Sequence, residues 1–164
     1  MKDANLFALL ALVACGQPAP PPDAPKADVV APDVAPTPAP QARTEAEIAA
    51  KIATLPAPYN AGAYENGRRM FAQCRSCHTV ELNGVNRVGP ALHGMFGRPA
   101  GVVPGFNSYS APLKQSGIIW DEARLDAWVE NPRDVVPGTN MVYPGLRKPE
   151  DRRDLVAYLK VETE

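Results

Sequence analysis

Few of the residues that metal and redox sites need are present in this chain. Its 164 residues include three cysteines and two histidines, and only Cys74 and Cys77 are closely spaced. A structural zinc site takes four ligands, and the only histidine besides His78 is His93, so zinc would be short of ligands. A thioredoxin-like motif ends a strand within a βαβ pattern, and no such pattern follows this pair. Zinc and a redox dithiol therefore remain lesser alternatives for the two thiols.

Aromatic residues are absent from Gln17 to Arg43, where nine prolines and seven alanines stand among 27 residues. Such a segment cannot bury enough apolar surface to offset its ordering entropy, so we expect a flexible, polyproline-like linker over 16–43. At about 3.1 Å per residue it would reach roughly 80 Å when fully extended. The main folded domain is expected over 57–164.

A clustered basic face is also missing. From Ala57 onward there are 13 Lys/Arg and 12 Asp/Glu, so the domain is nearly neutral. Nucleic-acid binding needs a basic patch or stripe, so this composition excludes nucleic acid as a partner. We expect most of the charges to lie on a solvated surface.

The apolar run from Ala4 to Ala14 is too short to span a bilayer as a helix, but it fits the apolar part of a secretory signal. It leads into Leu12-Val13-Ala14-Cys15, which resembles the cleavage box of bacterial lipoproteins, where the cysteine is lipidated and becomes the N-terminus. We therefore expect a signal peptide over 1–15, a lipid anchor at Cys15, and a membrane-anchored location in the bacterial periplasm. An ordinary cleaved signal or an uncleaved anchor is the alternative.

Four helices are expected from periodicity and end signals. Thr44 and Glu47 form a capping box for a short amphipathic helix within 44–56, which stops before Pro56. This helix either packs on the domain and ends the linker, or lies on a membrane or a partner. The other three expected helices are Ala61–Gln73, Asp121–Glu130 and Asp151–Val161.

Strand alternation and internal repeats are absent, and the chain between His78 and Trp120 is rich in glycine and proline. Loops should dominate that part, and the fold class is expected to be all-α. A domain this small has a thin core, so the loops must wrap a group other than protein.

The sequence Cys74-Arg75-Ser76-Cys77-His78 points to that group. Two thiols at i and i+3 lie about one helical turn apart, which suits thioether bonds to the two vinyl groups of one haem. His78 follows directly and is placed to reach the iron. The pattern predicts one covalently attached haem c.

Further motifs follow in a characteristic order. They are Gly67-Arg68-Arg69-Met70-Phe71, Gly89-Pro90-Ala91-Leu92-His93-Gly94, Phe96-Gly97-Arg98, Gly105-Phe106, Tyr109-Ser110, Trp120, Asn131-Pro132, Pro137-Gly138-Thr139 with Met141, and Leu155-Val156-Ala157-Tyr158-Leu159-Lys160. From about Tyr64 to Lys160 the chain resembles class I cytochromes c of the mitochondrial and bacterial c2 type. It looks like their membrane-attached bacterial forms, which carry electrons from the cytochrome bc1 complex to a terminal oxidase.

The resemblance assigns roles to individual residues. It implies that His78 is the proximal iron ligand, with its other ring nitrogen donating to the Pro90 carbonyl, and that Met141 is the distal ligand. It implies that four residues donate to the haem propionates, namely Arg98, Tyr109, Ser110 and Trp120. It also implies that the first and last domain helices cross, through packing of Gly67 and Phe71 against Leu155 and Tyr158.

Three residues are rivals of Met141 for the iron. Met70 and Met95 are expected to fill the core, and His93 matches a surface histidine of the family.

The chain also departs from the family pattern. Trp128 stands where a tyrosine is frequent near the methionine ligand, and its N–H can donate but not accept, so the hydrogen-bond network should differ. Leu113 replaces a common buried asparagine. Asn140 and Asp134 occupy positions that are frequently lysine, and a tether would make electrostatic steering less necessary.

These features predict a monomeric, single-haem electron carrier rather than an enzyme, with an all-α class I cytochrome c domain. Its expected partners are the cytochrome bc1 complex, cytochrome c oxidase and, through the anchor, a membrane. One alternative is a dedicated cytochrome subunit of a periplasmic dehydrogenase. Another is a haem peroxidase or gas-binding protein, which would need an open distal position.

Overall fold

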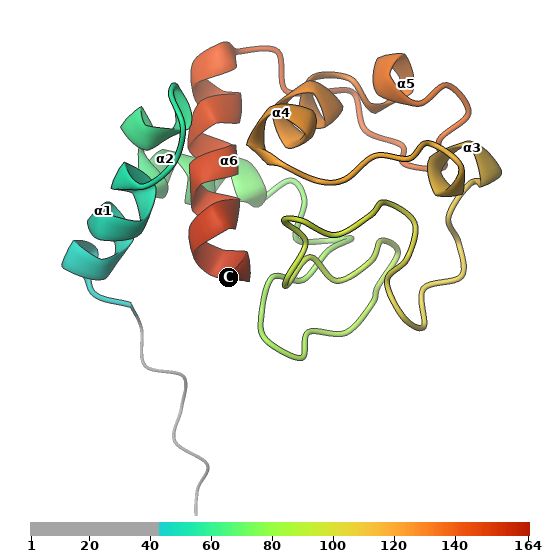
Figure 1. Ribbon diagram of the computed structural model, residues 1–164, viewed down its shortest axis with the longest axis horizontal. Helices are drawn as coiled ribbons and strands as arrows, with labels where there is room; N and C mark the ends of the chain where they lie inside the picture. The colour runs from blue at the N-terminus through green and yellow to red at the C-terminus, as the bar shows by residue number, and fades with distance from the viewer. Residues whose placement is uncertain (1–42) are drawn as a thin grey trace, which may run out of the picture. The chain divides into compact units, whose positions relative to one another are not determined.

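The structure is a computed structural model and describes residues 43–164 (Figure 1). The expected signal peptide, Cys15 and all of the expected linker except Arg43 lie outside the described residues. Within 43–164 the regular structure is helical, and the only β-pairing is an isolated antiparallel bridge between Pro99 and Ile119. The all-α fold class is confirmed.

The expected capping box begins helix α1 (Glu45–Ala53). The Thr44 N–H donates to Glu47 Oε2 over 2.7 Å, and the Glu47 N–H donates to the Thr44 hydroxyl over 3.3 Å. The helix buries Ile52, and the chain just beyond it buries Leu55. α1 packs against α6 (Pro149–Thr163) and the 3-10 helix η1 (Tyr59–Ala61), so the structure shows this helix docked on the domain.

Helix α2 (Tyr64–Phe71) is shorter than expected, because η1 precedes it and a series of turns follows it. It crosses α6 at Gly67, where an added Cβ would overlap the Asp154 carbonyl oxygen and lie 2.5 Å from the Tyr158 Cβ. The rings of Phe71 and Tyr158 are 5.5 Å apart between centroids. The expected crossing of the first and last domain helices is therefore present.

Helix α4 (Glu122–Glu130) ends before Asn131-Pro132, as expected. Two single-turn helices were not expected. α3 (Ala111–Lys114) is capped by the Ser110 hydroxyl, and α5 (Pro132–Val135) is capped by the Asn131 side chain. Both are too short for apolar periodicity to reveal them, so only their capping residues signal them in the sequence.

Helix α6 lies between α1 and α2 on one side and α4 on the other, and the long loops between α2 and α3 cover the remaining side (Figure 1). Backbone hydrogen bonds fasten these loops to the end of α6 and to the segment just before α4. The Gly94 N–H donates to the Thr163 carbonyl over 2.7 Å, and the Gly97 N–H donates to the Trp120 carbonyl over 2.8 Å. In this part of the chain no helix has both the length and the apolar character of a membrane span.

Candidate cofactor site

Cys74 to His78 continue from α2 as helical turns. The N–H groups of His78 and Cys77 both point to the Cys74 carbonyl, at 2.9 and 3.0 Å. Cys74 and Cys77 are not bonded to each other, and both line one cavity together with His78. The local backbone therefore brings two thiols and an imidazole to the same cavity wall.

The orientation of the His78 ring is set by a hydrogen bond. Its Nδ1 lies 2.8 Å from the Pro90 carbonyl oxygen, so Nδ1 carries the proton and Nε2 remains available as a ligand. Burial lowers the pKa of His78, although the bond to Pro90 acts in the opposite direction. The ring is thus kept neutral, which is the form that binds a metal ion.

Gly89 allows the chain to pass directly against this ring. A Cβ at Gly89 would overlap His78 Cε1 and would lie 2.7 Å from Nε2. The Gly89 N–H donates to the Cys77 carbonyl over 2.9 Å, which ties the two segments together. Any side chain here would displace the imidazole, so the orientation of His78 depends on glycine at position 89.

The cavity has a volume of about 670 Å³, which is within the range of sites for organic ligands and cofactors. It lies between the loops, α4 and α6, and most of its wall is apolar. All nine residues that the sequence singled out line it: Cys74, Cys77, His78, Pro90, Arg98, Tyr109, Ser110, Trp120 and Met141. An apolar cavity with two thiols, an imidazole and a thioether on its wall fits a covalently held haem.

Positive charge dominates the polar part of this wall. Arg98 and Arg87 line the cavity, and its lining includes no Asp or Glu side chain. The Arg98 guanidinium donates to the carbonyls of His93 and Ala91, at 3.0 and 3.3 Å, and burial lowers the pKa of Arg98. Burial also raises the pKa of Tyr109, which keeps its hydroxyl protonated as a donor. The wall is therefore suited to the anionic propionates of a haem.

Met141 is half-buried, and its segment is fastened at several points. The Met141 N–H donates to the Thr139 hydroxyl over 3.2 Å, and the Asn140 amide donates to the Ser108 carbonyl over 2.9 Å. The indole N–H of Trp128 donates to the Met141 sulfur over 3.2 Å. Trp128 stands where a tyrosine is frequent in the family, and the sequence indicated that the hydrogen-bond network near the methionine should differ there. The structure shows one hydrogen bond of that network, from Trp128 to Met141.

A comparison with known proteins decides the family, because the cytochrome c family model matches residues 64–161. The chain belongs to the cytochrome c family. It is 42% identical to cytochrome c of Kluyveromyces lactis over 106 residues, covering 64% of this chain and 96% of that protein. It is 48% identical to cytochrome c of Gibberella zeae over 103 residues, covering 62% and 96%. It is 47% identical to cytochrome c2 of Rhodomicrobium vannielii over 104 residues, covering 63% and 82%.

As a cytochrome c of the class I type, the chain holds one covalently attached haem c and carries electrons, and it is not an enzyme. When bound, the haem supplies an iron that alternates between ferric and ferrous states. The match begins at residue 64, so α1 and η1 lie outside the part that the family model covers.

The rivals of Met141 differ in where they lie. Met95 is buried and lines the same cavity, whereas Met70 and His93 are not among the lining residues. Within residues 43–164, the Nδ1 of His93 is buried without a hydrogen-bond partner. Met95 was expected in the core, and the structure places it there, at the wall of the haem cavity. Two thioethers, those of Met95 and Met141, therefore line this cavity.

The lesser alternatives for the cysteine pair find no support in the described residues. Burial, and then the neighbouring Cys77, raise the pKa of Cys74 to about 11, whereas a redox-active thiol needs a lowered pKa. Residues 43–164 contain no group of three or more His, Cys, Asp or Glu side chains that could hold a metal ion.

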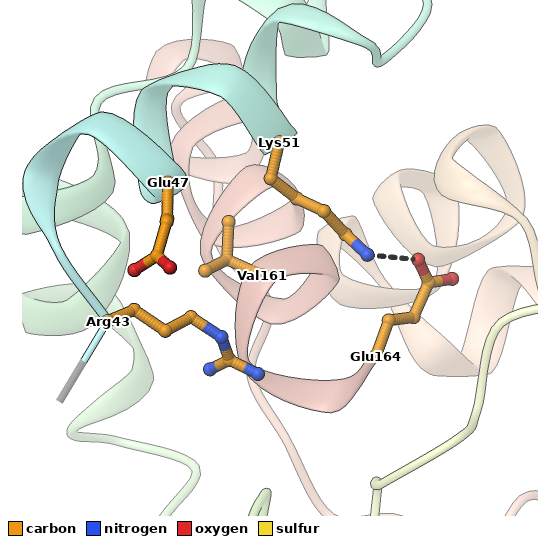
Figure 2. Close-up of a pocket in the computed structure, with 5 residues that line it drawn as sticks. All are labelled: Arg43, Glu47, Lys51, Val161 and Glu164. Atoms are coloured by element: carbon orange, nitrogen blue, oxygen red, sulfur yellow. Dashed lines mark ion pairs between the residues drawn. The ribbon is translucent and has the colours of Figure 1, made fainter. Parts of the chain in front are cut away.

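A second cavity of about 210 Å³ lies between α1 and the end of α6 (Figure 2). Three of its four charged lining residues serve in ion pairs. Lys51 lies 3.0 Å from Glu164, a pair that Figure 2 marks with a dashed line, and Arg43 lies 3.3 Å from Glu162. The fourth, Glu47, serves in the capping box of α1. None of its lining residues belongs to the haem cavity. This cavity is part of the packing of α1 on the cytochrome c domain.

Proposed function

We propose that this cytochrome c is a lipid-anchored carrier that takes single electrons from a cytochrome bc1 complex and delivers them to a terminal cytochrome c oxidase. The observation that carries the proposal is the pair of potential iron ligands that line one cavity, the His78 imidazole and the Met141 thioether. Iron held by two protein ligands changes its oxidation state with little rearrangement. A thioether also favours the ferrous state and raises the potential.

The site residues take the following roles in this proposal. Cys74 and Cys77 form the thioether bonds, His78 is the proximal ligand and Pro90 orients it. Met141 is the distal ligand. The donors to the haem propionates are Arg98, Tyr109, Ser110 and Trp120. Support comes from the cavity, which all of these residues line, and from its positive polar wall.

Replacing Met141 with alanine should remove the sixth ligand. The oxidised wild-type protein is expected to show the weak long-wavelength sulfur-to-iron absorption band, and the Met141→Ala variant should lose it completely. The reduction potential of the variant should fall, and its ferrous form should bind carbon monoxide. Visible spectra of the purified holoprotein in both oxidation states, with and without carbon monoxide, measure these changes.

Met95→Leu is the matched control, because it removes the other thioether of the wall and nearly keeps its volume. The Met95→Leu variant should keep the band and exclude carbon monoxide. If it loses the band while Met141→Ala keeps it, Met95 is the ligand. If the wild-type protein lacks the band and its ferrous form binds carbon monoxide readily, the distal position is open and a gas-binding or peroxidase function replaces the carrier.

The mouth of the cavity suits a carrier that is brought to its partners by a tether. Its exposed lining residues carry one charge between them, that of Arg87, and include two prominent valines, Val88 and Val142, which are 78% and 87% exposed. These residues therefore contribute little charge to long-range steering. The sequence of 16–43 supports a linker that would raise the local concentration of the domain at membrane partners.

The anchor proposal rests on the apolar run that leads into Leu12-Val13-Ala14-Cys15. In a Cys15→Ser variant, processing at this cysteine and acylation should be lost, and the protein should no longer carry a lipid. One acyl chain alone binds a membrane only marginally, so the wild type should carry more than one. Mass spectrometry of the N-terminal peptide measures the modification, with Ala19→Ser as a matched control that introduces the same residue but keeps Cys15. An unacylated wild-type N-terminus would contradict the proposal.

Electron flow in isolated membranes tests the proposed partners, the cytochrome bc1 complex and the oxidase. Membranes from cells that lack this cytochrome should regain oxidase-dependent electron flow when the wild-type protein is restored. If the oxidase does not oxidise the reduced protein, and the protein instead co-purifies with a dehydrogenase, the dedicated-subunit alternative is correct.

A further inference from the structure

The elements α1 and η1 precede the part of the chain that matches the cytochrome c family, yet they are packed as part of the domain. Ile52 of α1 and Leu55 just beyond it are buried, and Tyr59, the first residue of η1, is only 7% exposed. α1 contacts η1, and both contact α6. The ring of Tyr59 is therefore held in a defined place against the family fold.

The hydroxyl of Tyr59 reaches a side chain of α4. Its oxygen lies 3.4 Å from Asp126 Oδ2, which is a long hydrogen bond. Burial, and then the charge of Asp126, raise the pKa of Tyr59 to about 12, so the hydroxyl stays protonated and donates. The other oxygen of the carboxylate, Oδ1, accepts from Arg152 Nε over 2.6 Å. Tyr59 and Arg152 thus bind the two oxygens of one carboxylate, which limits its rotation.

The guanidinium of Arg152 continues this network to the segment that follows Met141. Its Nη1 donates to the carbonyls of Leu146 and Arg147, at 3.1 and 2.9 Å. The Leu146 N–H in turn donates to the Val129 carbonyl on α4 over 2.8 Å. The orientation of one guanidinium therefore decides whether two carbonyls of this segment have their donor.

We propose that Tyr59 is a positioning residue for the segment that follows Met141. Its hydroxyl holds the Asp126 carboxylate in the orientation that Arg152 binds, and Arg152 holds the segment in turn. Through this network, a part of the chain outside the family match limits the opening of the distal side of the haem cavity. The inference rests on the proposed function in one respect, that Met141 is the distal ligand.

The test uses Tyr59→Phe in the full-length holoprotein, because this variant removes the hydroxyl and keeps the ring. The Leu146 N–H reports on the segment, since it exchanges with solvent only when the segment opens locally. We expect its amide hydrogen exchange to become about threefold faster, as the loss of one weak hydrogen bond implies. The affinity of the ferric protein for imidazole, which competes with Met141 for the iron, should rise about twofold.

Tyr64→Phe is the matched control. It removes a shorter hydrogen bond of the same kind, which the Tyr64 hydroxyl donates to Glu162 over 2.7 Å. Among the described residues, neither of these two side chains bonds to Asp126 or Arg152. The control should therefore keep the wild-type exchange rate and imidazole affinity even if its melting temperature falls, so general destabilisation is separated from positioning.

A second background tests the route of the effect. Asp126→Ala removes the carboxylate through which the hydroxyl acts, so Tyr59→Phe should add nothing to the exchange rate of that variant. Thermal unfolding of each variant checks that it is folded.

The outcomes separate this proposal from the one on which it rests. An unchanged exchange rate in Tyr59→Phe, an equal change in Tyr64→Phe, or an effect that persists beside Asp126→Ala overturns the positioning role. Unchanged imidazole affinity overturns it as well where the wild type shows the sulfur-to-iron band. A wild-type protein without that band overturns Met141 as the ligand, and the exchange comparison then still decides the role of Tyr59.

Discussion

Replacing Arg152 with methionine is expected to lower the free energy of unfolding by about 3 kcal/mol and to loosen the segment that follows Met141. Arg152 projects from α6 and is 8% exposed. Its Nε donates to Asp126 on α4 over 2.6 Å, and its Nη1 donates to the carbonyls of Leu146 and Arg147 at 3.1 and 2.9 Å. One guanidinium therefore joins α6 and α4 to the chain segment that follows Met141.

The expected loss of unfolding free energy follows from the hydrogen-bond acceptors that the Arg152→Met variant leaves without a donor. Methionine nearly fills the volume but donates no hydrogen bond, so two carbonyls lose this donor. The Asp126 carboxylate keeps only the long hydrogen bond from the Tyr59 hydroxyl, at 3.4 Å. The nearby Glu130 side chain is 51% exposed, so its pairing with Arg152 adds little. Because Leu146 lies five residues after Met141, we also expect a weaker sulfur-to-iron band at elevated temperature.

Denaturant unfolding of the ferric holoprotein measures this change. Arg124→Met is the control, since Arg124 is an exposed arginine on α4 and its loss should change stability by less than about 0.5 kcal/mol. Equal stabilities of the Arg152→Met and Arg124→Met variants would show that the buried guanidinium contributes nothing beyond its volume.

A second large effect is expected from Gly67→Ala, which should destabilise the domain by about 3 kcal/mol. The added Cβ would overlap the backbone of Asp154 and lie 2.5 Å from the Tyr158 Cβ. A backbone carbonyl inside a helix cannot move aside as a flexible side chain does, so α2 must shift away from α6. This loss exceeds the gain of about 1 kcal/mol that alanine brings within a helix.

Gly97→Ala provides the matched control. A Cβ at Gly97 meets nothing within 4 Å, and the cost there comes only from its φ of +79°. We expect that variant to lose about 1 kcal/mol, without loss of haem incorporation. Thermal unfolding and the yield of holoprotein compare the two. A Gly67→Ala protein that melts as the wild type does would show that the two helices do not need their close approach.

Helix ends could be predicted wherever the signal is local. Thr44 and Glu47 are three residues apart, and their capping box appears in the structure as expected. The stop of α4 before Asn131-Pro132 depends likewise on adjacent residues. The extent of α2 was overestimated, since the turns of the haem attachment site begin at the end of that helix and resemble it in periodicity.

The residues that line the haem cavity could also be predicted, but the contacts among them could not. All nine residues singled out in the sequence line the one cavity. The place of Met95 on that wall and the bond from Trp128 to the Met141 sulfur were not predicted. Each depends on the distance between segments that are remote in the chain, and no pattern within a few residues encodes such a distance.

By itself, the sequence determined the chemistry of this protein: thiols one turn apart followed by a histidine, a later methionine, and a first helix marked by its own capping box. The tertiary structure decided how that chemistry is held. Only the crossing of α2 and α6 shows why Gly67 has no side chain, and only the packing of α4 on α6 brings Asp126 to Arg152. The physical reason is range, because bond angles and hydrogen bonding specify neighbours within one helical turn, whereas contacts across the domain form only when all the elements pack together.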